Sequence, residues 1–116
     1  MAFSDAALVI GANAMRTAVT HFQLHSAAPG AAGTTSPTTA ARQPTGTGAV
    51  DADGDITWSN INFTGVAANG AVTHVSYWSA VTAGTFYGSA QLTGDLTANA
   101  AGEYTITSIT ETSTAT

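Results

Sequence analysis

The stretch VTHVSYWSAVTAGTFYGSAQL, residues Val72–Leu92, decides the fold class of this chain. Its two halves, Val72–Ala80 and Thr85–Leu92, are rich in valine, threonine and aromatic residues, which favour β-strands. The dipeptide Ala83–Gly84 between them is a turn signal. Two strand-like runs separated by a short turn are typical of an antiparallel sheet.

The same pattern continues on both sides of this stretch. Runs of the same composition predict further strands at Ile56–Asn62, Phe63–Val66 and Tyr104–Thr112. Turn residues separate the runs, and Ala68-Asn69-Gly70 is a hairpin signal of the Asn-Gly kind. Several short strands at this spacing predict an all-β fold, an antiparallel β-sandwich of two sheets.

The last strand-like run is irregular. A turn signal at Asn99–Gly102 precedes it, and Tyr104 and Ile106 then alternate in period 2. Ile109 falls out of step with this alternation. The slip predicts a β-bulge near Thr107-Ser108.

The N-terminal part predicts a short helix or arm over residues 1–15. Ser4 is suited to cap a helix and Asp5 favours the positive end of its dipole, so a helix is expected over Asp5–Met15, with a strand as the competing interpretation. From Val19 to Leu24 the pattern alternates. Phe22 and Leu24 are the expected inward pair.

All three prolines fall in the stretch Ser26–Gly48, among Gly, Ala, Ser and Thr. Proline interrupts both helix and sheet pairing, so a long surface loop is expected. The whole chain of 116 residues is the size of one domain. We therefore expect a single domain, 1–116, with a helix or arm at 1–15, a loop at 26–48 and the main β region at 55–112.

Charge and composition exclude several classes of function. The chain has no lysine, its only basic side chains apart from histidine are Arg16 and Arg42, and its net charge is −5 at pH 7. Binding to nucleic acid needs a cationic surface that this chain lacks. No apolar run approaches the roughly 20 residues that span a bilayer, so we expect no membrane partner. Without cysteine, neither disulfides nor thiolate metal sites form.

Asp51, Asp53 and Asp55 form the one acidic cluster that suggests a metal. Clustered carboxylates suit Ca²⁺, but an EF-hand loop needs glycine at its sixth position and glutamate at its twelfth. This chain has Ile56 and Asn62 there. A solvated acidic turn before a strand is favoured, and a Ca²⁺ site is the weaker alternative.

The histidines do not form a zinc or catalytic site in the sequence pattern. On a strand, His21 and His25 share a face at a separation of about 13 Å, too far apart to share an ion. His74 lies in another strand and has no well-placed carboxylate beside it. No nucleophile elbow and no carboxylate pair suited to glycoside hydrolysis is present. We expect no cofactor and no enzymatic activity.

The aromatic side chains have two interpretations. They lie in strand-like runs, where such residues are most often core or interface anchors, and a sugar-binding surface is the functional alternative. The residues concerned are Trp58, Tyr77, Trp78, Phe86 and Tyr87.

Several segments resemble a known family. Phe22–Gly30 is similar to the pattern V-x-L-H-T-A-D-P-G, and Ala41-Arg42-Gln43 is similar to Y-A-R-Q. Val72–Ala80 and Gly84–Ala90 resemble V-T-H-V-G-Y-W-S-A and G-T-F-L-G-S-G. These patterns belong to small virion structural proteins of tailed phages of actinobacteria, described as tail fibre or minor structural proteins. The resemblance implies a non-enzymatic component of the virion.

Two places in the virion are compatible with this resemblance. A fibre normally needs a long shaft, and this sequence has neither heptads nor repeats. We therefore expect a capsid decoration or minor capsid protein on the outer shell of the head, bound to the major capsid protein and self-associated as a homotrimer. A tail-fibre or receptor-binding module that recognises host-surface carbohydrate is the alternative.

The attachment surface is expected in the segments that the sandwich explains least. These are the apolar N-terminal segment and the proline-rich loop, both of which can become ordered on a partner. Arg16 and Arg42 lie in or beside them and can pair with carboxylates of a partner or of this chain. The expected partner-binding residues are Phe3, Leu8, Arg16 and Arg42.

Overall fold

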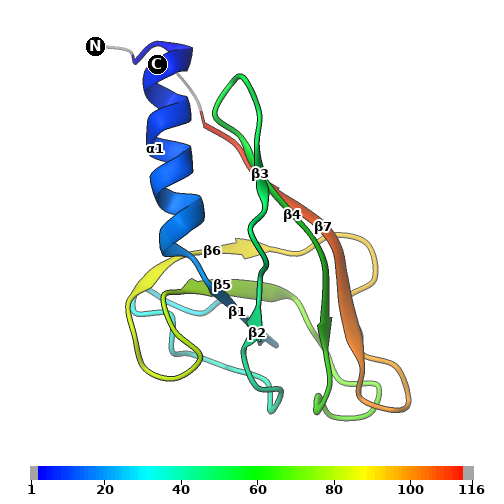
Figure 1. Cartoon of the computed structure of the whole chain (residues 1–116). Coiled ribbons are helices and arrows are strands. Elements are labelled where there is room, and N and C mark those ends of the chain that lie inside the picture. The colour runs from blue at the N-terminus through cyan, green and yellow to red at the C-terminus, as the bar shows by residue number, and fades with distance from the viewer. Residues whose placement is uncertain (1–2, 114–116) are drawn as a thin grey trace.

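The fold is that of a computed structural model, which describes residues 3–113. One helix precedes the strands along these residues (Figure 1). The elements are α1 (Asp5–Ala18), β1 (His21–His25), β2 (Gln43–Pro44), β3 (Ala49–Val50), β4 (Ile56–Phe63), β5 (His74–Trp78), β6 (Phe86–Gln91) and β7 (Tyr104–Glu111).

The strands form two antiparallel sheets. One sheet has the order β2-β1-β5-β6 and the other has the order β3-β4-β7. Apolar side chains from both sheets meet in one core between them. The predicted all-β sandwich with a short N-terminal helix is therefore confirmed.

The centre of the core is aromatic. Phe22 of β1 lies against Trp58 of β4, with ring centroids 5.2 Å apart in an edge-to-face arrangement, and against Tyr77 of β5 at 4.9 Å. Phe22 and Leu24 are fully buried, as the alternation predicts. This cluster joins the two sheets and buries the largest apolar groups of the chain.

Helix α1 begins where the sequence predicts and ends later. The Ser4 hydroxyl accepts a hydrogen bond from the backbone N–H of Ala7, and the helix continues to Ala18, beyond the predicted end at Met15. Side chains stabilise the extra turn, because Arg16 and Thr17 both donate hydrogen bonds to Asn13. Within residues 3–113, no helix has the length and apolar character needed to cross a bilayer.

Two predictions about strand connections are wrong. The predicted strands Ile56–Asn62 and Phe63–Val66 are one strand, β4, followed by an irregular segment. The Asn69-Gly70 turn forms, but it joins β4 to β5, which lie in different sheets, so it closes no hairpin. A local turn signal specifies the reversal of the chain and leaves open which sheet the next strand enters.

The predicted bulge in the last strand is also corrected. The β4–β7 register is the same on both sides of Thr107, so neither strand has an extra residue there. Instead, Asn60, opposite Thr107, adopts a positive φ of 57°. The core-facing positions change in both strands at this point, which explains why Ile109 falls out of step. The bulge lies in β6, where Tyr87 is the extra residue between two pairs of the β5–β6 ladder.

The proline-rich stretch is ordered against the sandwich. It contributes β2, which pairs with β1, and Pro37 bridges to His25. Ala40 and Thr45 of this stretch are buried. The stretch is therefore a loop, as predicted, but one that is tied to the sheet along its length.

Candidate interaction surfaces

Helix α1 exposes an apolar stripe. Phe3, which lies just before the N-cap Ser4, and Ile10 within the helix are 66% and 73% exposed. Ala6 and Ala14, at helical spacing on either side of Ile10, are exposed too. The helix carries only two charged residues, Asp5 in its first turn and Arg16 in its last. We call the stripe Phe3, Ala6, Ile10 and Ala14 the apolar face of α1. Exposed apolar surface of this kind is typical of a protein–protein contact.

The opposite side of α1 packs on the chain itself. Ala12 is buried, and Leu8 lies directly over Gly54, where an added Cβ would be 2.8 Å from the Leu8 Cβ. The positive φ of Gly54, 84°, also favours glycine. Leu8, an expected partner-binding residue, is thus half-buried against the turn before β4, whereas Phe3 is free to meet another chain.

The two arginines bind within the chain and to no carboxylate of the described residues. Arg16 donates to Asn13 Oδ1 and to the carbonyl oxygen of Thr47. Arg42 donates to Gln23 Oε1 and to the carbonyl oxygens of Ala80 and Ala83, at 3.1 and 2.7 Å. Their expected role in partner binding stays a prediction, but both guanidinium groups already have acceptors.

Arg42 also attaches the proline-rich loop to the outer face of the β2-β1-β5-β6 sheet. Its guanidinium carbon lies 3.8 Å from the centroid of a Trp78 ring, a cation–π contact. Trp78 in turn packs on Phe86, and the backbone of Gly33 lies so close to Phe86 that any side chain at Gly33 would collide with that ring. The loop therefore covers a second, smaller aromatic cluster.

A buried chain of hydrogen bonds lies beneath the loop. Trp78 Nε1–H, which can only donate, bonds to Ser76 Oγ at 2.7 Å, and Ser76 Oγ lies 2.7 Å from His25 Nε2. His25 Nδ1 lies 2.8 Å from the carbonyl oxygen of Thr35, which can only accept. The Thr35 carbonyl requires that His25 carries a proton on Nδ1, and with a neutral imidazole Ser76 then donates to Nε2. His25 is therefore a buried strand histidine with both ring nitrogens in hydrogen bonds.

Burial lowers the pKa of His25 below its ordinary value of 6.5, and the nearby His74 and Arg42 lower it further. The hydrogen bond to Thr35 opposes this effect only in part. The imidazole is thus held neutral and works as a structural link between loop and sheet. This arrangement offers neither of its nitrogens to a metal or a substrate.

The acidic turn brings its three carboxylates together. Ligand-type oxygens of Asp51, Asp53 and Asp55 lie within 4.8 Å of one another. Asp51 Oδ1 accepts the backbone N–H groups of Asp53 and Asp55, and Asp55 Oδ1 accepts that of Ser113. The carboxylates of Asp51 and Asp55 therefore shape the turn before β4. The choice between an acidic turn and a Ca²⁺ site stays a prediction.

A groove of about 340 Å³ separates α1 from the sandwich. Met15 of the helix and Tyr87 of β6 line it, and both are 40% exposed. Tyr77, which also lines it, donates a 2.5 Å hydrogen bond to Glu111 Oε1, so β5 and β7 are linked across the two sheets. Burial, together with this bond to a carboxylate, raises the pKa of Tyr77 above its usual range.

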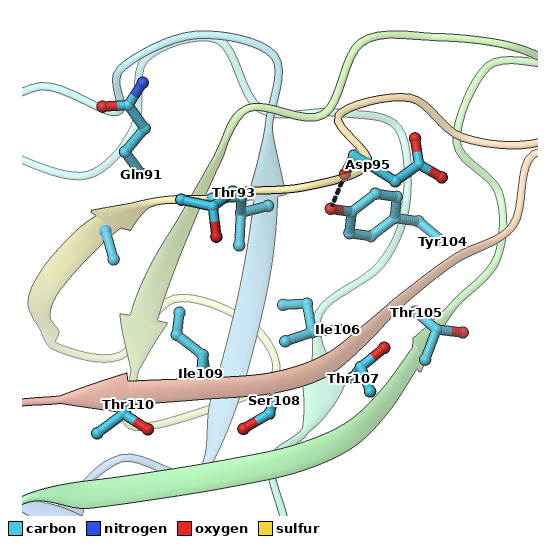
Figure 2. A pocket seen from close by; sticks show the side chains of 12 residues that line it. Gln91, Thr93, Asp95, Tyr104, Thr105, Ile106, Thr107, Ser108, Ile109 and Thr110 are labelled. Carbon is cyan, nitrogen blue, oxygen red and sulfur yellow. Dashed lines mark hydrogen bonds between the residues drawn. The ribbon is translucent and has the colours of Figure 1, made fainter.

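A second groove, of about 390 Å³, follows β7 (Figure 2). Its other wall is the end of β6 and the residues after it. Figure 2 shows Ile106 and Ile109 on one side of β7 and Thr107, Ser108 and Thr110 on the other, and all five line the groove. The groove lies between the edges of the two sheets, β6 and β7, on the side of β7 away from β4.

Most of the aromatic residues serve the core. Trp58, Tyr77 and Trp78 are at most 5% exposed, and Phe86 is half-buried under Gly33. Only Tyr87 of this group presents a large exposed area. The interpretation as core anchors is confirmed for the three most buried rings, which have no free face on which a sugar can stack.

The residues that the sequence analysis missed are Ile10 and the strand edge of β7. Ile10 is the most exposed of the large apolar side chains in the described residues. Its seven-residue separation from Phe3, with Ala6 at helical spacing from Ile10, was the available signal. The free edge of β7 has no local signal, because sheet order is set by distant residues.

An ordered two-sheet sandwich, a loop whose polar groups are bound within the chain and a helix with an apolar outer face define a structural module. Its free surfaces suit contact with other protein chains.

The comparison with protein families identifies the family of this module. The podophage GP4 fiber I protein gp80 family matches residues 6–114, nearly the whole chain. The chain belongs to this family of bacteriophage fibre proteins, so it is a structural protein of the virion.

This result confirms the prediction that the chain is a phage virion protein. No curated protein and no solved structure matches the chain. The family does not specify the host, so the actinobacterial host stays a prediction.

Proposed function

We propose that the chain is a non-enzymatic subunit of a virion fibre and that the apolar face of α1 holds it in the particle. The observation that carries this proposal is the exposure of Ile10 on a helix with almost no charge, and of Phe3 just before that helix, in a chain of net charge −5. The apolar face is the part of the surface that gains most from being covered. The fibre family supports the assignment to a fibre.

The position of α1 suits this role. The helix stands at one side of the sandwich and contacts β3, so its outer face is clear of both sheets (Figure 1). A helix of 14 residues is about 21 Å long, enough for a partner to contact three turns. A partner that contributes an apolar helix or groove would bury Phe3 and Ile10 together.

A substitution that places a charged side chain on the apolar face of α1 tests this proposal. Phage that encode the Ile10→Glu variant should assemble particles that lack this protein, because the glutamate would have to be buried in the contact. The matched control is Val81→Glu, since Val81 is also an exposed apolar residue, at 56%, but lies in the β5–β6 turn. Quantitative mass spectrometry of purified particles gives the copy number. Incorporation of Ile10→Glu at the wild-type copy number would contradict the proposal.

A capsid decoration protein is the second candidate. The small size of the chain, 46 × 25 × 23 Å, suits a module that sits on a shell. In this role the apolar face of α1 would bind the major capsid protein, and copies would gather as a homotrimer at a local three-fold position. Immunogold labelling of intact particles distinguishes the candidates. Label confined to the tail supports the fibre, and label over the head supports decoration.

A further inference from the structure

The groove between α1 and the sandwich is separate from the apolar face of α1. Residues of the helix, of β4, β5 and β6 and of the end of β7 line it. Met15 in its wall is five residues after Ile10, which places the two side chains about 140° apart around the helix. The groove volume of about 340 Å³ lies at the lower end of the range for ligand pockets, about 300–1,000 Å³. A small ligand can therefore occupy the groove while the apolar face is covered.

Tyr87 gives the groove an aromatic ring with free area. The other two rings that line it, Trp58 and Tyr77, are buried, whereas Tyr87 is 40% exposed. Tyr87 is also the extra residue of the β6 bulge. Bulges redirect a side chain and occur often beside functional sites. The irregularity of β6 thus coincides with the one ring of this groove on which a ligand can stack.

Gly11 keeps the helix wall of the groove low. Glycine in a helix interior costs about 1 kcal/mol relative to alanine, so its presence in the middle of α1 needs a reason. Neither a positive φ nor a close neighbour supplies one, since a Cβ at Gly11 would meet no atom within 4 Å. A larger side chain at this position would instead occupy the groove that Gly11 lines. An open groove is therefore the reason that the structure offers for this glycine.

Glu111 supplies the groove with a carboxylate in a fixed position. Its Oε1 accepts the hydrogen bond of the Tyr77 hydroxyl, and its Oε2 accepts none within residues 3–113. A carboxylate oxygen can accept more than one hydrogen bond, and bonds to an ionised acceptor are the strong ones. Glu111 is also the only charged side chain among the described residues that line the groove. The groove thus suits a ligand that donates hydrogen bonds and carries no negative charge.

A neutral sugar ring has the chemistry that these groups recognise. A pyranose presents C–H groups on its faces, and these groups are attracted to the electron-rich face of an aromatic ring such as Tyr87. Its rim carries hydroxyl groups, which can donate to Glu111. An acidic sugar fits less well, because its carboxylate would lie near that of Glu111 without a cation between them.

We propose that the groove between α1 and the sandwich binds a neutral pyranose unit, stacked on Tyr87 and with a hydroxyl group that donates to Glu111. The helix and the bulged strand β6 form its two walls, and Gly11 leaves room for the ring between them. The site is independent of the proposed attachment through the apolar face of α1, so the two proposals can fail separately.

Titration of the full chain with simple sugars, followed by the NMR shifts of its backbone amides, tests the site. The neutral probes are methyl α-glucopyranoside, methyl β-galactopyranoside and N-acetylglucosamine, and glucuronic acid is the anionic comparison. At least one neutral probe should give saturable shifts with a Kd of about 1 mM. The shifts should concentrate at groove residues such as Gly11, Gly88 and Ser113. Glucuronic acid should bind at least about fivefold more weakly, because Glu111 repels its carboxylate.

Two pairs of variants locate the ligand. Tyr87→Ala should raise the Kd about fivefold or more, and Tyr87→Phe, which keeps the ring face, should not. Val81→Ala is the control for loss of an exposed apolar side chain outside the groove. Gly11→Leu should abolish binding by filling the groove, whereas Ala14→Leu on the exposed side of α1 should leave the Kd unchanged. Leucine is a good helix former, so both leucine variants keep the helix.

Glu111→Gln tests the polar contact without removing the acceptor of the Tyr77 hydroxyl, since the glutamine Oε1 can still accept that bond. The variant should bind the neutral probe about threefold more weakly and lose its discrimination against glucuronic acid. Wild type that gives no shifts with any neutral probe at about 10 mM, ten times the expected Kd, would overturn the proposal. Shifts confined to residues outside the groove would overturn it as well, and so would binding that both Tyr87→Ala and Gly11→Leu leave unchanged.

Discussion

The sequence predicts that the proline-rich loop and helix α1 both lie outside the main strands, yet the structure treats them differently. The loop uses its polar groups on its own sheet, through Arg42 on Trp78 and Thr35 on His25. The helix packs one side on the chain and leaves Phe3 and Ile10 exposed. A segment for which the sequence predicts neither helix nor strand is therefore not, on that ground, a binding site. Exposed apolar surface on a well-formed element is the stronger indication.

Removal of Trp78 should have the largest effect. Trp78→Ala deletes the platform for Arg42 and opens a large cavity, which costs about 3–5 kcal/mol of stability. Trypsin can cleave only after Arg16 and Arg42, since these are the only arginines and lysine is absent. Cleavage after Arg42 should therefore accelerate more than cleavage after Arg16. Equal acceleration at both sites would show that the loop is not held separately by this cluster.

Loss of the Ser76 hydroxyl should have the next largest effect. Ser76→Ala leaves Trp78 Nε1–H and His25 Nε2 buried without a partner, at a cost of about 1–3 kcal/mol. The control is Ser89→Ala, because Ser89 lies opposite Ser76 on β6 and is exposed. Denaturant unfolding should show a change within about 0.5 kcal/mol for the control. A similar loss in both variants would remove the hydrogen-bond chain as the explanation.

Acid should weaken the attachment of the loop. The folded state holds His25 neutral, with a pKa below its ordinary value of 6.5, whereas the unfolded chain takes up a proton near that value. The unfolded state therefore binds more protons, and stability should fall as the pH drops below about 6.5. NMR titration of the His25 ring should show a neutral imidazole with the proton on Nδ1 at pH 6.5. A ring already protonated there would contradict the direction of the shift.

The smallest effect is expected on the exposed side of α1. Ile10→Glu should change the free energy of unfolding by no more than about 0.5 kcal/mol, because Ile10 is 73% exposed in the isolated chain. Thermal unfolding followed by circular dichroism measures this. A severe loss of stability would mean that Ile10 is needed for folding, and the contrast between helix and loop would fail.

Local patterns predicted the elements that depend on nearby residues. Ser4 caps the helix, Phe22 and Leu24 face the core, and the strand-like runs after residue 55 become strands. Predictions that required a distant partner were less successful. The Asn69-Gly70 turn joins two sheets, and the irregularity at Ile109 arises from Asn60 on the neighbouring strand.

For the candidate surfaces too, the sequence predicts what depends on nearby residues and misses what depends on distant ones. The sequence placed Phe3 at an attachment surface, and its side chain is indeed exposed. Leu8 was grouped with it by composition, but the close approach of Gly54 gives Leu8 an internal contact. Arg42 has its acceptors far along the chain, at Ala80 and Ala83, which no spacing rule connects.

By itself, the sequence determined that this chain forms a small, acidic β-sandwich with a capped N-terminal helix. Period-2 patterns, turn residues and capping groups act over a few residues, so they can be recognised without the fold. Only the tertiary structure decided which strands share a sheet, which edge stays open and which apolar side chains find no partner. These properties depend on contacts between distant segments, as when Trp78 meets Arg42 and when β7 is left with β4 on one side alone.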